Sequence, residues 1–273
     1  MFVWLGGGRM LLQLVLGVLV AMLAVMVAAW AFGLARRNGG WTDVFWTWGS
    51  GAVLAVAAFW PAVGDIEPAR QTLVAAMVVL WATRLGLYLT PRVAGHPEDA
   101  RYAKFRQDFG PRYPMGMLFV TLPQAPATAL LSVSVLLAAH SPGPAPALRD
   151  AAALALFLVA IAGEAVADAQ MKRFRADPAN RGKVIDTGLW AWSRHPNYFF
   201  QWLGWLAYPV IALDPGRPLT WLSLTAPAVM YGLLRHVSGV PPLEAAMLES
   251  RGEAFRDYQR RVPVFFPSPP KKA

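Results

Sequence analysis

The sequence predicts an all-α integral membrane protein with about seven transmembrane helices, an outside N-terminus and a cytoplasmic C-terminus. Of its 273 residues, 56% are hydrophobic and only 15% are charged, which is not the balance of a soluble protein. The apolar residues collect in long runs, and the basic residues are concentrated in alternate loops. We therefore expect one polytopic membrane domain over residues 1–273, without a separate soluble domain.

The apolar runs give the predicted helices in order. The first run extends from Leu11 to Phe32 without a charged residue, and a helix of roughly 20 apolar residues matches the hydrocarbon core of a bilayer. It is too long for the apolar centre of a cleaved signal peptide, so we expect it to remain as a span. Proline, glycine or charged residues separate the later runs, and the last two are short for a full crossing. The predicted spans are residues 11–32, 43–63, 71–90, 115–139, 147–168, 198–213 and 219–236.

The basic residues predict the orientation. One set of alternate loops, together with the C-terminal segment, holds 20 of the 25 Lys and Arg residues, and short loops rich in these residues stay in the cytoplasm. Anionic lipid and this asymmetry account for most of the net charge of +9, so we do not expect nucleic-acid binding. The absence of cysteine excludes disulfides, thiolate catalysis and cysteine metal sites, and we expect no metal. Nothing in the sequence indicates the oligomeric state.

Three carboxylates lie where a membrane protein places few charges, because an ionisable group inside a span needs a partner or a function. Asp43 lies at the start of the second predicted span, where the alternative interpretation is a carboxylate at a helix N-terminus. Glu164 and Asp168 are four residues apart in the fifth, which puts both on one helix face. The basic stretch 172–175 that follows is typical either of a lipid-surface anchor or of a phosphate pocket.

The most polar part of the chain, residues 164–201, ends in the sequence SRHPNY at Ser193–Tyr198. Proline disfavours a helical conformation at His195, so the motif predicts a turn that opens a helix. A helix N-terminus with Arg and His donors suits an anion, and Asn and Tyr add hydrogen bonds for ribose or amide groups. The alternative is a capped interfacial helix with an aromatic belt residue.

Three sequence blocks carry a family resemblance. They are WATRLGLYLTPR at 81–92 with HPEDARYAKFR at 96–106, ADAQMKRFRADPANRGKVIDTGLWAWSRHPNYF at 167–199, and SGVPPLEAAMLESRGEAFRDYQRRVPVFFP at 238–267. In these blocks the chain resembles the bacterial DUF1295 membrane proteins, which belong with the steroid 5α-reductases and other sterol reductases. The resemblance implies a bacterial inner-membrane reductase that uses NADPH from the cytoplasm to reduce a C=C bond in a steroid-, enoyl-lipid- or isoprenoid-like substrate. Residues 1–140 would then form a substrate chamber, and residues 141–273 the NADPH-binding region.

The same resemblance implies which residues hold NADPH. The family's cofactor-binding pattern matches one group of residues in the central block and a second group in the C-terminal block, near the family's contacts to the adenosine and phosphates of the cofactor. Together these residues are Glu164, Asp168, Arg175, Trp190, Arg194, His195, Asn197, Tyr198, Glu244, Arg251 and Tyr258. The chain departs from the family after RHPNY, where a small residue and an acid are common. Phe199-Phe200-Gln201 stands there, so hydrogen-bonding capacity is kept but the charge is lost.

Reduction of a polarised C=C bond also requires a donor for the enolate oxygen that develops. Asp43 and Tyr102 are the candidates for this catalytic role, and the resemblance supplies no matching residue for it.

Two other interpretations remain. A membrane S-adenosylmethionine-dependent methyltransferase of the isoprenylcysteine or phospholipid type also has an RHP-x-Y motif, and its C-terminal pattern is loosely matched by Glu244, Gly252, Phe255 and Tyr258. Asn197 and the segment 168–175 favour the reductase. The third interpretation is a non-catalytic membrane protein, although the paired repeats of many transporters are absent from the sequence.

Overall fold

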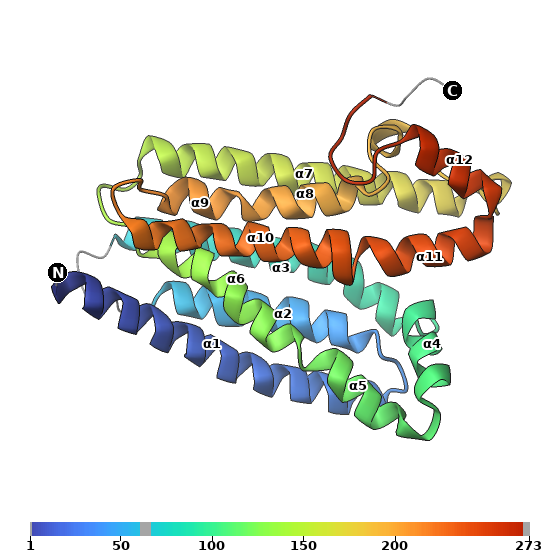
Figure 1. The fold of residues 1–273 in the computed structure, drawn as a ribbon, viewed down its shortest axis with the longest axis horizontal. Coiled ribbons are helices and arrows are strands. Elements are labelled where there is room, and N and C mark those ends of the chain that lie inside the picture. The colour runs from blue at the N-terminus through green and yellow to red at the C-terminus, as the bar shows by residue number, and fades with distance from the viewer. Residues whose placement is uncertain (1, 61–66, 270–273) are drawn as a thin grey trace. The chain divides into compact units, whose positions relative to one another are not determined.

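The computed structural model describes residues 2–60 and 67–269, and all regular structure among these residues is helical (Figure 1), which confirms the all-α prediction. Four short 3₁₀ segments (110–112, 178–180, 188–191 and 218–224) and one π-helical turn (Leu233–Val237) accompany the α-helices. The α-helices are α1 (Phe2–Ala35), α2 (Trp41–Ala58), α3 (Pro68–Ala94), α4 (Ala100–Phe109), α5 (Tyr113–Thr121), α6 (Gln124–Ala139), α7 (Leu148–Ala176), α8 (Pro196–Trp205), α9 (Ala207–Ala212), α10 (Thr225–Gly232), α11 (Val240–Arg251) and α12 (Glu253–Arg261).

Within the described residues, four helical stretches are long and apolar enough to cross a membrane. They are Gly8–Ala35, Pro68–Ala94, Arg101–Ala139 and Leu148–Ala176, and they correspond to the first, third, fourth and fifth predicted spans. The second prediction, 43–63, becomes α2, which ends at Ala58, and positions 61–63 lie outside the described residues. The last two predictions are each divided into shorter helices, which contain Pro209 and Pro227. Helices suited to a membrane are therefore present, whereas seven spans and their orientation stay predictions.

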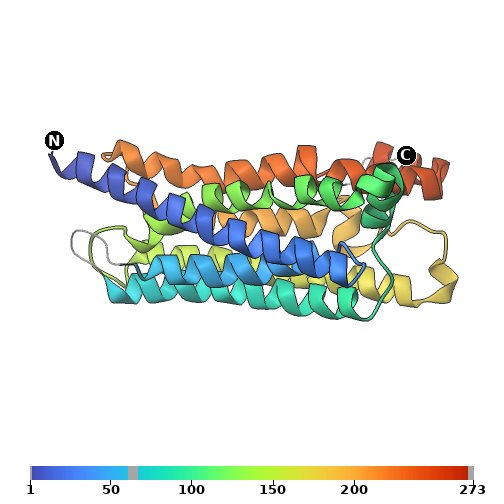
Figure 2. The same cartoon turned by 90° about the horizontal axis from the view of Figure 1, so that it is seen from below.

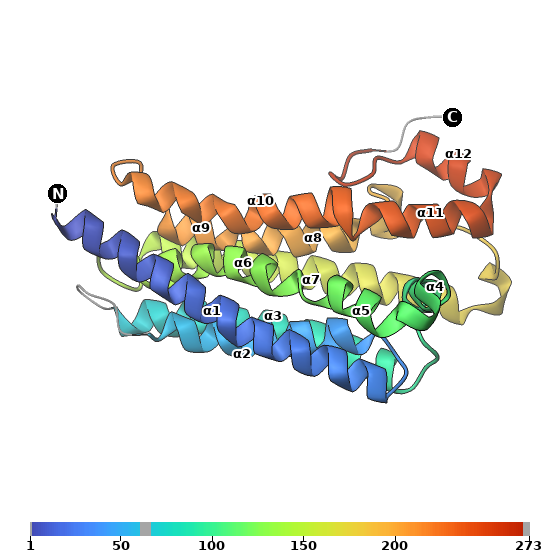
Figure 3. The same ribbon diagram turned by 60° about the horizontal axis from the view of Figure 1, so that its bottom comes forward.

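The helices pack into two compact units, which we describe separately. The first combines Met1–Ala151 with Tyr208–Ala226, and the second combines Ala152–Ala207 with Pro227–Ala273. In the first unit, α2 packs between α1 and α3 (Figure 2), and α4 is seen end-on next to α5 in Figure 3. The predicted functional halves, 1–140 and 141–273, remain predictions.

Small and hydroxylated side chains hold the first unit together. A Cβ atom at Gly51 of α2 would lie 2.3 Å from the Cβ of Ala82, so α2 and α3 approach closely only because this residue is glycine. Trp46 Nε1 donates to Thr128 Oγ1 of α6 at 2.9 Å, and the hydroxyls of Ser50 and Thr128 are 3.2 Å apart. Close backbone approach and hydrogen bonds of this kind replace the hydrophobic driving force that helices lack in lipid.

A buried ion pair joins the start of α3 to the start of α7. The Arg70 side chain is 0% exposed, and its Nε and Nη2 donate to the two carboxylate oxygens of Asp150 at 2.9 and 3.0 Å. Its remaining donors bind the carbonyl oxygens of Ser141, Gly143 and Pro144 at 2.6–2.9 Å. All the donor nitrogens of this buried guanidinium are thus used, as a charge outside water requires.

Loss of the Arg70–Asp150 pair should destabilise the fold. Arg70→Met leaves Asp150 buried without its cation, and we expect it to lower the free energy of unfolding by about 3–5 kcal/mol. Thermal unfolding of the detergent-purified protein measures the effect. Arg217→Met is the control, because it removes a pair with Asp214 whose side chains are 46% and 44% exposed and should cost less than about 1 kcal/mol. Equal losses in the two variants would contradict the account.

Candidate functional site

The SRHPNY motif opens a helix, as predicted. Pro196 is the first residue of α8, His195 precedes it with an extended φ of −136°, and Asn197 lies on the first turn. Proline suits this position because the N–H that it lacks would have no acceptor in the first turn of a helix. α8 packs closely against α7, where a Cβ atom at Gly163 would lie 2.4 Å from the ring of Phe200.

Glu244 of α11 is the centre of a polar cluster in the second unit. Its Oε1 accepts hydrogen bonds from Arg194 Nε at 2.7 Å and from His195 Nε2 at 2.9 Å, and its Oε2 accepts from Gln259 Nε2 at 2.8 Å. Burial alone would raise the pKa of Glu244. The hydrogen bonds from His195, Arg194 and Gln259 and the charge of Arg194 outweigh burial and lower this pKa to about 2. Glu244 is therefore an ionised carboxylate.

His195 is 3% exposed and has one nitrogen without a partner. Burial lowers its pKa, and this effect exceeds the opposing influence of Glu244, so the ring is neutral near pH 7. Because a carboxylate can only accept, Nε2 carries the proton and Nδ1 keeps its lone pair. Nδ1 is buried and has no hydrogen-bond partner among residues 2–60 and 67–269. The Tyr198 ring stacks on the imidazole with a centroid distance of 5.4 Å, which leaves His195 as a fixed, unused acceptor.

Arg194 holds the C-terminal tail against this turn. Its backbone N–H donates to the Pro263 carbonyl at 2.9 Å and its Nη1 to the Val262 carbonyl at 2.7 Å. Ser193 Oγ donates to the carbonyl of Phe265, whose side chain is 1% exposed. The red segment after α12 in Figure 1 is this returning tail. Arg194 was predicted as a cofactor contact, but its Nε, Nη1 and Nη2 all donate within the protein.

Trp190 and Tyr258 hold the same turn in place through hydrogen bonds to backbone carbonyls. Tyr258 Oη donates to the Trp190 carbonyl at 2.6 Å, and Trp190 Nε1 donates to the Ala167 carbonyl of α7 at 3.1 Å. Burial raises the pKa of Tyr258, so its hydroxyl stays protonated. These two predicted site residues thus fix the position of the motif through backbone contacts.

The carboxylates of α7 lie together, as their spacing predicted. Glu164 and Asp168 are 5% and 8% exposed and one turn apart in the same helix. Asn197 Nδ2 donates to Asp168 Oδ1 at 3.4 Å, which joins this face to the start of α8. Gln201 is buried one turn after Asn197.

The structure separates two predicted residues from this group and adds others. Arg175 is exposed at the end of α7, and Arg251 donates to the carbonyls of Lys183 and Ser250. Gln259 was not among the predicted site residues, and Ser193 was predicted only as part of the SRHPNY motif. The apolar residues Val262 and Phe265 of the C-terminal segment were the available signal for a packed tail, and both are buried, whereas Phe266 is 50% exposed.

In the first unit the two predicted catalytic residues are in direct contact. Tyr102 is 4% exposed, and its Oη donates to Asp43 Oδ1 at 2.9 Å. Arg101 Nη2 donates to the other carboxylate oxygen at 3.3 Å. Tyr102 also lies against the α1–α2 turn, where a Cβ atom at Gly39 would be 2.7 Å from its ring. Hydrogen bonds and close packing thus fix the position of the Tyr102 ring against Asp43.

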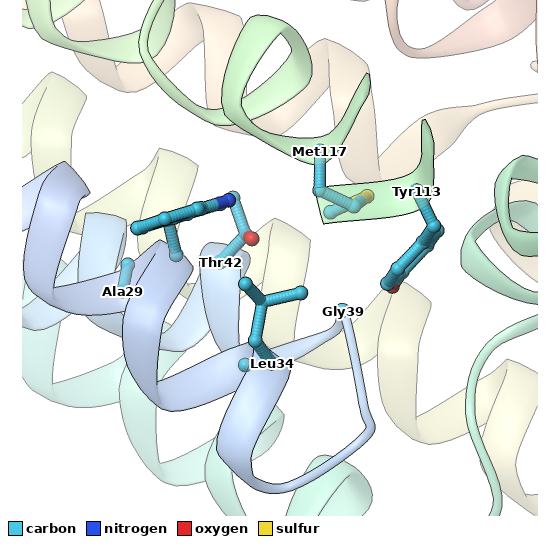
Figure 4. A pocket seen from close by; sticks show the side chains of 8 residues that line it. Ala29, Leu34, Gly39, Thr42, Tyr113 and Met117 are labelled. Atoms are coloured by element: carbon cyan, nitrogen blue, oxygen red, sulfur yellow. The ribbon is translucent and has the colours of Figure 1, made fainter. Parts of the chain in front are cut away.

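A small pocket lies near this pair (Figure 4). Trp30 and Leu34 of α1, Thr42 of α2 and Tyr113 and Met117 of α5 line a hollow whose roughly 170 Å³ of space between atoms includes open solvent and leaves no room for an enclosed water molecule. Sites for drug-sized ligands measure about 300–1,000 Å³. This pocket alone is too small for a steroid, and the substrate chamber stays a prediction.

The Glu244 cluster predicts that acid destabilises the fold. Below the ordinary pKa of 6.5, an unfolded His195 binds a proton that the folded protein excludes, so the free energy of unfolding falls. Glu244 adds a further loss between its ordinary pKa of 4.5 and about 2, because its folded pKa is depressed.

The melting temperature of the detergent-purified protein should therefore decrease from neutral pH to about pH 5. The decrease should be smaller in His195→Gln and unchanged in His236→Gln, since His236 is exposed. The same pH dependence in His195→Gln and the unaltered protein would contradict the assignment.

The sequence is similar to known proteins over most of its length. Residues 29–262 match the family described as "Protein of unknown function (DUF1295)". An uncharacterized protein of Schizosaccharomyces pombe, C594.04c, is 26% identical over 263 residues, which cover 87% of this chain and 75% of the relative. No solved structure matches. Since the family match covers most of the chain, including α7, the SRHPNY turn and α12, the chain belongs to the DUF1295 family.

Proposed function

We propose that this protein is a membrane-embedded, NADPH-dependent reductase of a C=C bond in a lipophilic substrate. The unpartnered Nδ1 of buried His195 is the observation that carries the proposal. Buried polar atoms nearly always have a hydrogen-bond partner, so this acceptor suits a ligand with an N–H or O–H donor. A nicotinamide carboxamide and the ribose hydroxyls of a dinucleotide carry such donors.

The other residues fit the same class of ligand. Glu164 and Asp168 are buried carboxylates of α7, and Asn197, whose Nδ2 donates to Asp168, has an amide oxygen that is an acceptor by its chemistry. Arg175 and Arg251 supply cations for phosphates. Bound NADPH would supply a hydride for a polarised C=C bond. Trp190, Arg194, Glu244 and Tyr258 act indirectly in this proposal, because they hold the turn and the tail in place.

Tyr102 is the proposed proton donor to the substrate. Its hydroxyl is oriented by Asp43, and Arg101 shares the same carboxylate. Because the single hydroxyl proton of Tyr102 is donated to Asp43, a substrate oxygen would have to replace Asp43 as the acceptor before this phenol could stabilise a developing enolate. The substrate class stays open between steroid-like, enoyl-lipid and isoprenoid compounds.

We also propose seven membrane crossings in a bacterial inner membrane, with the C-terminus in the cytoplasm. The excess of basic residues on one set of loops supports this orientation. A green fluorescent protein fused to the C-terminus should fluoresce in bacterial cells, because that fusion folds on the cytoplasmic side. A dark C-terminal fusion that is expressed and full-length would contradict the orientation.

Cofactor binding distinguishes this proposal from a methyltransferase. We expect the detergent-purified protein to bind NADPH, detected by the cofactor's own fluorescence, with micromolar affinity and to bind no S-adenosylmethionine. Binding of S-adenosylmethionine without binding of NADPH would refute the reductase proposal.

Asn197→Ala tests the location of the cofactor. Loss of a buried hydrogen bond is expected to weaken NADPH binding by at least about tenfold. Asn180→Ala is the matched control, since the Asn180 side chain donates to the Phe174 carbonyl at the end of α7, and its affinity should not change. If Asn197→Ala binds NADPH as tightly as the unaltered protein, the cofactor lies elsewhere.

A further inference from the structure

A row of exposed cations follows the apolar part of α7. Lys172, Arg173 and Arg175 lie in its last two turns, and Arg181 and Lys183 follow in the next loop. All five side chains are exposed. Arg173 donates only to the carbonyl of Ala169 in its own helix, and that bond leaves its charge uncompensated.

The two nearby carboxylates are used for other contacts. Asp177 accepts from the backbone N–H of Ala179 and so caps the 3₁₀ segment 178–180. Asp186 pairs with Arg261 at 3.3 Å. The charge of the row is therefore not offset by the acids of its own loop.

Helix α12 shows the opposite pattern. Arg256 and Arg260 pair with Glu253 at 3.2 and 3.0 Å, and Arg261 pairs with Asp257 at 2.9 Å. Each arginine of α12 thus has a carboxylate partner within the protein. This helix is a natural internal control, because it carries cations in the same unit without an uncompensated charge.

The position of the row favours lipid as its partner. It begins where a helix long and apolar enough to cross a membrane ends, which is the level of the lipid headgroups. Clusters of Lys and Arg next to a span attract anionic lipid by about 1 kcal/mol per residue. A site for a free phosphate would instead gather buried donors or a helix N-terminus around one point, whereas these side chains are exposed and spread over twelve positions of sequence.

We propose that Lys172, Arg173, Arg181 and Lys183 form a binding surface for the phosphate groups of anionic phospholipids. Arg175 is left out because it is a proposed cofactor residue. The inference does not depend on the proposed enzymatic activity. Bound lipid would also restrain the loop that leads from α7 to Trp190 and the SRHPNY turn.

The test measures lipid retention by the detergent-purified full-length protein, using native mass spectrometry with added phosphatidylglycerol or phosphatidylcholine. We compare the unaltered protein with the variant Lys172→Gln/Arg173→Gln/Arg181→Gln/Lys183→Gln and with the control Arg256→Gln/Arg260→Gln. The fourfold variant should bind phosphatidylglycerol at least about tenfold more weakly. The control should keep its affinity, and added salt should weaken binding to the unaltered protein.

Three results would overturn the proposal. The first is that the unaltered protein and the fourfold variant bind phosphatidylglycerol with equal affinity. The second is that the unaltered protein binds the two lipids with equal affinity. The third is that inorganic phosphate at equal concentration inhibits lipid binding. NADPH affinity should be kept in the fourfold variant, which separates this test from that of the proposed function. Should the fourfold variant fail to fold, the pairs Lys172→Gln/Arg173→Gln and Arg181→Gln/Lys183→Gln must each give a partial loss, and no loss in either pair overturns the proposal.

Discussion

One partly buried carboxylate, Glu244, links the elements of the second unit. Glu244 binds side chains from the start of α8 and from α12, so a single ionised group joins three helices. Arg194 extends this junction to the tail through the carbonyls of Val262 and Pro263. Removing one partner of such a group leaves the other charge buried and uncompensated, which is far more costly than exchanging a surface pair. The geometry of the SRHPNY turn, and the unpaired nitrogen of His195, follow from this junction.

The first unit meets the same requirement by different means. Arg70 is enclosed by Asp150 and three carbonyl groups, and Asp43 is held by Tyr102 and Arg101. Between these positions the helices are joined by hydroxyls and close glycine contacts. The buried pair of Arg70 and Asp150 must be satisfied by the protein itself, whereas the side chains of Asp43 and Arg101 are 31% and 41% exposed. Hydrogen bonds from Tyr102 and Arg101 thus hold both carboxylate oxygens of Asp43.

The sequence predicts the parts of this fold that depend on local patterns. Long apolar runs predict α1, α3 and α7 because length and hydropathy alone define a span, and Pro196 predicts the start of α8. The division of the last two predicted spans was not foreseen, since a proline inside a short apolar run is compatible with either a kinked or a broken helix. The Glu164–Asp168 spacing correctly indicates a shared helix face. The partner of Arg194 lies 50 residues away at Glu244, and only the tertiary structure shows that this arginine is used internally. The unpaired Nδ1 of His195 likewise depends on tertiary packing, and no local sequence pattern indicates it.

The central claim is that the polar cluster around His195 serves a reduction. The most direct measurement incubates the purified protein, in lipid nanodiscs, with lipophilic enones and with NADPH that carries deuterium at the nicotinamide C4 position. The account predicts a saturated product with deuterium on its β-carbon, and loss of that product in Asn197→Ala but not in Asn180→Ala. Formation of no saturated product, together with methyl transfer from S-adenosylmethionine to a lipid acceptor, would contradict it.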